Sequence, residues 1–93
     1  MKYDISPSDF TRVDNDSNGN PRYALHYTRL ITIDEYEQTK DEGMAGVDIR
    51  YDIAVRKANK LGGRRFHTKK YGGGIVFQSY SLPELINAIN ERL

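Results

Sequence analysis

The sequence predicts an α+β fold: two β-hairpins form a four-stranded antiparallel sheet, with two or three helices packed on one face, in ββααββα order. Three observations lead to this prediction. Two pairs of alternating segments flank turn-rich stretches, helical periodicity appears after each pair, and the length of 93 residues suits one domain over residues 1–93.

The hairpins are predicted from apolar and polar residues that alternate on either side of turns. Segments 10–13 and 23–31 flank "DNDSNGNP", whose residue types favour turns. Segments 65–70 and 75–80 flank "YGGG", where consecutive glycines permit positive φ. In segment 23–31 the apolar residues share one parity, as in a half-buried strand: Tyr23, Leu25, Tyr27 and Ile31.

The first predicted helix is short and polar. Thr32 and Glu35 have the spacing of a capping box, which indicates a helix over 33–42 that stops at Gly43. "GMAG" then reads as a flexible joint, because glycine weakens helices.

Two further helices follow from their caps and apolar stripes. Asp48 is expected to cap a helix over 49–61 that ends at Gly62. Its expected inner face consists of Tyr51, Ala54, Val55, Ala58 and Leu61. "SLPE" begins the last helix, with Ser81 as its N-cap, and one apolar stripe repeats at helical spacing along it: Leu82, Leu85, Ile86, Ile89 and Leu93.

Charge is distributed unevenly although the net charge is only +1. Residues 1–49 carry 5 basic and 10 acidic side chains, whereas residues 50–70 carry 8 basic and 1 acidic. A local excess of positive charge attracts polyanions. The alternative is internal compensation, in which the acidic half of the chain folds against the basic segment.

Composition also indicates the compartment. The absence of cysteine excludes disulfides and thiolate zinc sites and fits a reducing environment. "MKYDISPSDF" has no apolar core of a signal peptide, and no apolar run approaches a membrane span. We therefore expect a cytoplasmic protein with no membrane segment.

A two-layer domain of this kind leaves one sheet face uncovered, and strand parity predicts its residues. If Phe66, Ile75 and Phe77 face the helices, Arg65, His67, Lys69 and Tyr71 point outward, as do Val76, Gln78 and Tyr80 on the neighbouring strand. From the first hairpin, Arg22, His26 and Thr28 would join them. Aromatic side chains among basic ones form a surface suited to single-stranded RNA or DNA.

The predicted nucleic-acid-binding set combines this face with the basic helix. It comprises Arg56, Lys57, Lys60, Arg64, Arg65, His67, Lys69, Lys70, Tyr71 and Tyr80. The same residues also fit an ordinary solvated sheet, because Tyr, Thr and Val are common in strands and basic residues on an edge strand deter aggregation.

A protein-interaction module is the alternative function. Ile49 and Ile53 form an apolar spot inside the basic side of the predicted helix, and Gly72, Gly73 and Gly74 lie in a hairpin loop that can meet a partner. Nearly equal numbers of acidic and basic residues favour this alternative. The small core also makes a homodimer possible.

No pattern in the chain is specific enough to predict catalysis, a metal or a cofactor. His26 and His67 have the chemistry for acid–base cleavage of RNA, but the sequence does not fix their separation. The glycines of "YGGG" lie between strands rather than before a helix, unlike phosphate-binding loops. "DNDSNGNP" resembles a calcium loop but lacks the closing glutamate. We expect no enzymatic activity, no metal and no cofactor.

Three features together resemble a group of phage-encoded proteins: "NGNPRYALHY", "AVRKANKLGGRRFHTKKYGGGIVFQSY" and the short C-terminal helix. They are similar to small uncharacterised proteins of bacterial phages or mobile elements. The resemblance covers most of the chain and implies an accessory protein, and it brings no catalytic residues.

Overall fold

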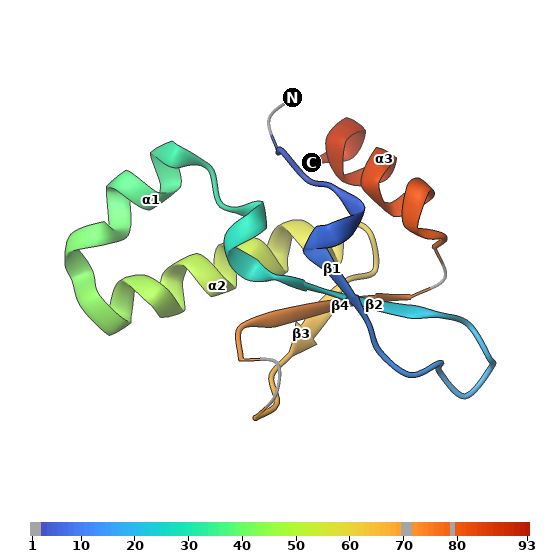
Figure 1. The fold of residues 1–93 in the computed structure, drawn as a ribbon. Coiled ribbons are helices and arrows are strands. Elements are labelled where there is room, and N and C mark those ends of the chain that lie inside the picture. Colours follow the sequence, from blue (N-terminus) through green and yellow to red (C-terminus); the bar gives the residue numbers. More distant parts are fainter. Residues whose placement is uncertain (1–2, 70–71, 79) are drawn as a thin grey trace.

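The computed structural model describes residues 3–69, 72–78 and 80–93, and it confirms the predicted α+β fold (Figure 1). Helices and the N-terminal segment lie on one side of a four-stranded antiparallel sheet, whose other side has no helix over it. The strands are β1 (Phe10–Arg12), β2 (Arg22–His26), β3 (Arg64–Phe66) and β4 (Gly74–Gln78). The helices are α1 (Ile33–Thr39), α2 (Gly43–Asn59) and α3 (Leu82–Arg92).

The strand order is β1-β2-β4-β3, so the two central strands come from different hairpins. Their antiparallel register pairs Tyr23 with Phe77 and Leu25 with Ile75. Directly opposed residues project from the same face of a sheet. These four side chains therefore form the floor of the core beneath the helices.

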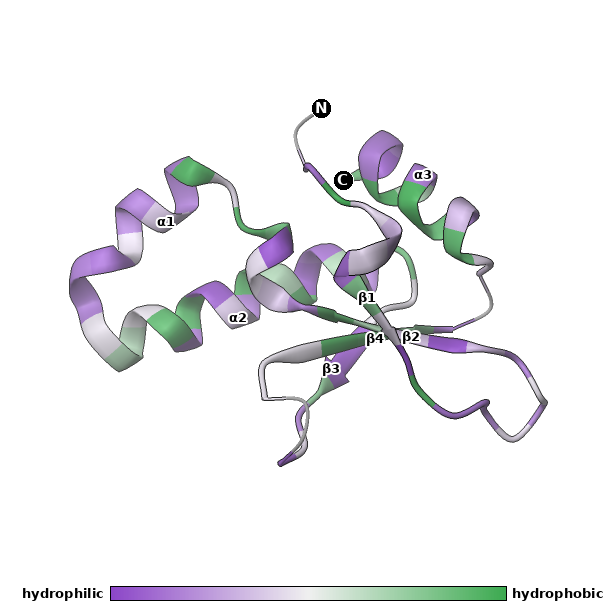
Figure 2. Ribbon diagram, viewed as in Figure 1, coloured by the Kyte–Doolittle hydropathy of each residue, from purple (hydrophilic) through white to green (hydrophobic). Residues whose placement is uncertain are grey.

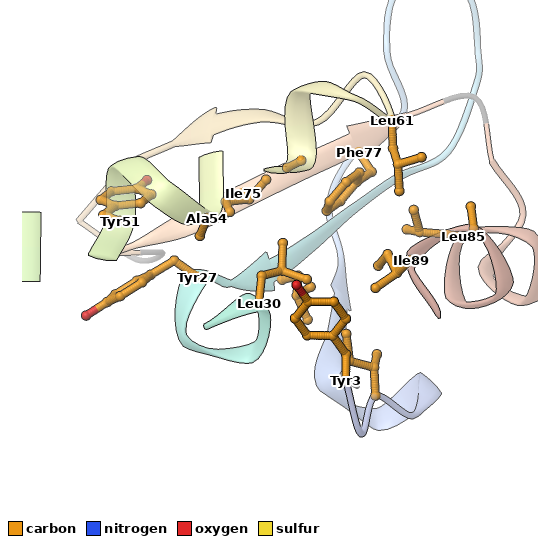
Figure 3. Packing of buried hydrophobic residues seen from close by; sticks show 14 residues of the cluster. Tyr3, Tyr27, Leu30, Tyr51, Ala54, Leu61, Ile75, Phe77, Leu85 and Ile89 are labelled. Atoms are coloured by element: carbon orange, nitrogen blue, oxygen red, sulfur yellow. The ribbon is translucent and has the colours of Figure 1, made fainter. Parts of the chain in front are cut away.

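The core lies between this floor and the helices (Figure 3). Leu30 covers the floor from the turn after β2, and α3 contributes Leu85 and Ile89. Ala54 and Ala58 of α2 are fully buried, and their small side chains let this helix approach the sheet closely. The buried face of α2 and the apolar stripe of α3 are as the sequence predicts.

The end of β2 differs from the prediction. β2 ends at His26, and Tyr27–Leu30 forms a 3₁₀ turn, η2, rather than continuing the strand. The turn buries both Tyr27 and Leu30, because residues three apart in a 3₁₀ turn lie on one side. The turn thus places both Tyr27 and Leu30 in the core, whereas a continued strand would point them to opposite faces of the sheet.

"GMAG" is the other clear correction, because it forms the first turn of α2 rather than a flexible joint. Gly43 adopts a φ of 56°, which lets the chain reverse after the 3₁₀ turn Lys40–Glu42. At Gly46 a Cβ atom would lie 2.3 Å from the Thr39 carbonyl oxygen. Glycine therefore permits the close contact between α1 and α2, and Asp48 lies inside α2 instead of capping it.

The predicted caps of the other two helices are confirmed. Thr32 Oγ1 accepts a hydrogen bond from the Glu35 amide, and the Glu35 carboxylate accepts one from the Thr32 amide at 2.9 Å. Ser81 Oγ accepts a hydrogen bond from the Glu84 amide at 3.4 Å. Both contacts satisfy amide groups that the helix itself leaves unpaired.

We expect Gly63→Ala to destabilise the fold by about 1–3 kcal/mol, because overpacking a filled core has this cost. The added methyl group would lie 2.6 Å from the Phe77 ring and 2.8 Å from the Ala58 Cβ. Gly72→Ala is the matched control, since nothing lies within 4 Å of its Cβ position. Urea unfolding followed by circular dichroism measures both variants, and equal stability of the two would contradict the packing argument.

Candidate nucleic-acid interface

The uncovered sheet face carries three rows of side chains, and Arg22 opposes Gln78 in the first of them. Arg64, Val76, Ala24 and Thr11 oppose one another across the four strands in one row. Phe66, Gly74 and His26 form the next row. The rows between them contain the buried residues Leu25 and Ile75, so alternation places Arg64, Phe66 and His26 on the uncovered face. We call this surface the open sheet face.

The predicted orientation of β3 is therefore wrong. Arg65 opposes Ile75 and shares the helix side of the sheet, whereas Phe66 lies on the open face. The Arg65 guanidinium carbon lies 4.3 Å from the ring centroid of Tyr51, and its Nη2 atom lies 3.5 Å from Asp52 Oδ1. On the open face, the Arg22 guanidinium carbon lies 5.9 Å from the Phe66 ring centroid. A cation–π contact thus exists on each side of the sheet.

Tyr51 explains why Arg65 points toward the helices. Its hydroxyl donates a hydrogen bond to the Gly74 carbonyl at 2.6 Å and accepts one from the backbone of Phe66, so it joins the two strands of the second hairpin. Burial raises the pKa of Tyr51, and the Arg65 charge opposes this shift. The phenol therefore remains protonated and keeps its donor at neutral pH. Arg65 packs on this ring as part of the scaffold.

Lys57 is turned inward instead of lying with the exposed cations of α2. Its Nζ atom lies 2.5 Å from Glu35 Oε1 and 2.8 Å from the Leu30 carbonyl oxygen. It also lies 5.2 Å from the ring centroid of Tyr3, and only 18% of its side chain is exposed. Internal compensation thus accounts for this lysine, which fastens α1 to α2 and to the turn after β2.

The other cations of the predicted set differ in how they are neutralised. Arg56 is an exposed residue and pairs with Asp52 at 3.0 Å, so Arg56 and Arg65 share one carboxylate. Lys60, Arg64 and Lys69 are exposed and form no ion pair within the described ranges. Lys70 and Tyr71 lie outside the described residues. Among the described residues of the predicted nucleic-acid-binding set, three basic side chains therefore have no carboxylate partner.

The loop of the second hairpin is held at its base. Gly73, with a φ of 75°, accepts a hydrogen bond from the Tyr27 amide at 2.9 Å, and its own amide lies 3.4 Å from His67 Nδ1. A Cβ atom at Gly73 would lie 3.2 Å from His26 Nε2. The two histidines, 41 positions apart in the sequence, thus flank the same glycine at one end of the open sheet face. Gly72 is exposed, whereas Gly74 is a buried residue of β4.

Next to His26 the open face has a hollow of about 210 Å³. It is lined by Asp9, Thr11, Ala24, Leu25, His26, Gly72 and Gly74. Asp9 accepts a hydrogen bond from the Ser6 amide at 2.8 Å and lies 3.3 Å from Arg29 Nη2. The Ser6 amide is the main reason why the pKa of Asp9 is lowered, against the effect of burial. Asp9 is therefore anionic at neutral pH, and Arg29 compensates its charge at the rim of the hollow.

Tyr80 does not face outward as predicted. It is partly buried and packs against the hydrophobic core cluster. Val76 and Gln78 do have the predicted outward parity, as do Arg22 and His26. Parity thus succeeds within β2 and β4 and fails for Tyr80, which lies beyond the end of its strand.

The first hairpin loop is organised by hydrogen bonds to the Asp16 carboxylate. Asp16 Oδ1 accepts hydrogen bonds from the Asn18 and Asn20 amides, each at 2.9 Å. These contacts form an Asx-type turn. In the described part of the chain, no group of three or more His, Asp or Glu side chains is placed to hold a metal ion.

A second surface lies on a helical protrusion that extends from the sheet (Figures 1 and 2). We call residues 33–49, which comprise α1, the 3₁₀ turn and the start of α2, the helical arm. Hydrophilic residues dominate its α1 segment (Figure 2), yet four large apolar side chains are exposed on it: Ile33 (79%), Tyr36 (50%), Met44 (74%) and Ile49 (41%). Ile49 thus lies at the surface, and Ile53 is half-buried. Sequence patterns missed Met44, because "GMAG" read as a joint.

Together these features describe a small α+β domain with an open sheet face and a protruding helical arm. Residues 5–93 match the family model described as Staphylococcus phage terminal repeat-encoded protein TreK, and the chain belongs to this family. The phage resemblance seen in the sequence is thereby confirmed. No curated protein and no solved structure matches the chain. No helix of the described residues is long and apolar enough to cross a membrane.

We expect Lys57→Met to destabilise the protein by about 1–3 kcal/mol, because it leaves the partly buried Glu35 carboxylate without its cation. Arg56→Met is the matched control one position earlier in the helix. It removes an exposed pair, which contributes at most about 1 kcal/mol. Urea unfolding at neutral pH measures both, and a control that is destabilised as much as Lys57→Met would contradict the assignment.

The Glu35 contact also predicts a pH dependence. Burial acts to raise the pKa of Glu35, but hydrogen bonds from Lys57 and the Thr32 amide outweigh it and hold this pKa below its usual value. A lowered pKa in the folded state stabilises the protein above the pKa of the unfolded state, and the effect is lost as the pH falls through the folded value. Glu35→Gln should therefore lose less stability than the wild type between neutral pH and about pH 3. Unfolding curves at both pH values test this; parallel losses would contradict it.

Proposed function

We propose that the protein binds single-stranded nucleic acid, RNA or DNA, on its open sheet face, as an accessory cytoplasmic protein without catalytic activity. The observation that carries this proposal is the register of β3, which places Arg64 and Phe66 on a sheet face that no helix covers. A cation and an aromatic ring on one flat surface are the two elements that single strands require.

The charges that remain after internal pairing support the proposal. Glu35 neutralises Lys57, and Asp52 is shared by Arg56 and Arg65. Arg64 and Lys69 belong to the cations that no carboxylate neutralises in the described ranges, and both lie on the second hairpin. A phosphate that binds them displaces counterions and breaks no ion pair described within the protein.

The shape of the face favours stacking of single-stranded bases over insertion into the groove of a duplex. The small side chains of Ala24 and Val76 lie in its central row. Phe66 offers a planar ring to a base, and the Arg22 guanidinium beside this ring is held by an ion pair with Asp14. Within the part of the chain that the structure describes, no helix lies on this side to enter a major groove. Arg64 and Lys69 lie at the β3 end of the face, and we expect the phosphate backbone to run along this side.

A protein-interaction role is the second candidate, and a specific observation favours it. The exposed large apolar side chains among the described residues all lie on the helical arm. Clustered exposed apolar residues usually mark an interaction surface.

Fluorescence anisotropy of labelled single-stranded RNA and DNA tests nucleic-acid binding. We expect Arg64→Ala/Lys69→Ala to weaken binding about tenfold at low salt and to reduce the slope of log K against log salt by about 1.4, the effect of two phosphate contacts on a single strand. Phe66→Leu should weaken binding by about fivefold with an unchanged slope, because it removes stacking and no charge.

Arg56→Ala is the matched control, since it removes an equally charged side chain that belongs to α2 rather than to the sheet. Its affinity should stay within about twofold of the wild type. Two results would overturn the proposal: no binding of the wild type at low salt, or an equal loss of affinity in the double variant and in this control.

A further inference from the structure

The helical arm combines apolar exposure with unneutralised negative charge. Of its carboxylates, Glu35 pairs with Lys57 and Glu37 pairs with Lys40 at 2.7 Å. Four others form no ion pair within the described residues: Asp34, Asp41, Glu42 and Asp48. Ile33, Tyr36, Met44 and Ile49 are exposed among them. A partner must therefore present both positive charge and apolar surface.

The arm is also built as a firm protrusion. Arg50 Nη1 donates a hydrogen bond to Thr39 Oγ1 at 2.9 Å, and its guanidinium carbon lies 5.3 Å from the Tyr36 ring centroid. The close approach at Gly46 holds α2 against the end of α1. A surface held in advance of binding loses little conformational entropy when it docks.

The chain itself presents the complementary charge. Arg64 and Lys69, both on the second hairpin, are exposed and unneutralised within the described ranges, and we call them the basic surface. Two arms cannot face each other favourably, because their carboxylates would repel. An arm against a basic surface brings opposite charges together. The exposed ring of Tyr36 and the side chain of Met44 can then pack along the aliphatic stems of these cations.

We propose that the helical arm docks on the basic surface of a second copy of this chain. The arm of the second copy docks on the basic surface of the first in the same way, so the two copies form a symmetric dimer. A reciprocal contact forms twice, which closes the assembly at two copies. This inference deepens the protein-interaction role and does not depend on nucleic-acid binding. Because Arg64 and Lys69 would serve both contacts, nucleic acid is expected to compete with the arm.

Analytical ultracentrifugation with charge-swapped variants tests the dimer. Asp41→Lys/Glu42→Lys reverses the charge of these two arm positions, and Arg64→Glu/Lys69→Glu reverses the charge of the basic surface. All four residues are exposed, so the changes leave the core intact. Each variant alone should dimerise at least about tenfold more weakly than the wild type, because both of its contacts become repulsive. An equimolar mixture should recover dimers, because both contacts between unlike copies are then attractive.

Two further variants complete the design. Met44→Ser should weaken the dimer because it removes apolar area from the contact and leaves the charge of the arm unchanged. Glu84→Lys/Glu91→Lys is the matched control, since it makes the same charge change as the arm variant on exposed positions of α3. The control should dimerise as the wild type does.

The outcomes separate this inference from the proposed function. A wild-type protein that stays monomeric at about 100 µM and low salt overturns the dimer, since such an interface would then be weaker than specific interfaces normally are. A dimer that survives both charge swaps, or a mixture that stays monomeric, overturns it as well. In each case, binding of labelled oligonucleotide that depends on Arg64 and Lys69 would leave the nucleic-acid proposal intact.

Discussion

The pairing of β2 with β4 is the constraint on which the remaining structure depends. It joins strands that lie about fifty positions apart, and it sets Leu25 against Ile75 and Tyr23 against Phe77. A shift of one residue in a strand moves all of its side chains to the other face. This register therefore decides which side of the sheet receives the helices and which side stays open, and β3 inherits its orientation from β4.

Electrostatic pairing inside the fold then determines which charges remain for a partner. Lys57 and Glu35 are 22 positions apart, and their contact fixes α1 beside α2. Arg65 is held between Tyr51 and Asp52. The basic segment is thus divided into cations that support the fold and cations that face solvent. The acidic half is divided likewise, and four of its carboxylates without an ion pair within the described residues lie on the helical arm: Asp34, Asp41, Glu42 and Asp48.

Local sequence signals account for much of the fold. The turn residues after β1, the capping residues Thr32 and Ser81, and the apolar stripes of α2 and α3 all act over a few positions, so they could be predicted. "GMAG" was mispredicted because glycine disfavours helices locally, whereas here Gly46 permits close contact with Thr39. The end of β2 was also missed, since the 3₁₀ turn depends on burial of Leu30 beneath other elements.

The sequence by itself determined the α+β class, the order of the elements, the phage resemblance and the uneven distribution of charge. These features depend on composition and short-range periodicity, which survive without knowledge of distant contacts. Only the tertiary structure decided that Arg64 and Phe66, rather than Arg65 and His67, define the open sheet face. It alone brought His26 and His67 to Gly73 and turned Lys57 inward. Strand register and ion pairing depend on contacts between residues far apart in the sequence. A register shift of one residue moves every side chain of a strand to the other face, so alternation along a short strand cannot specify which face is open.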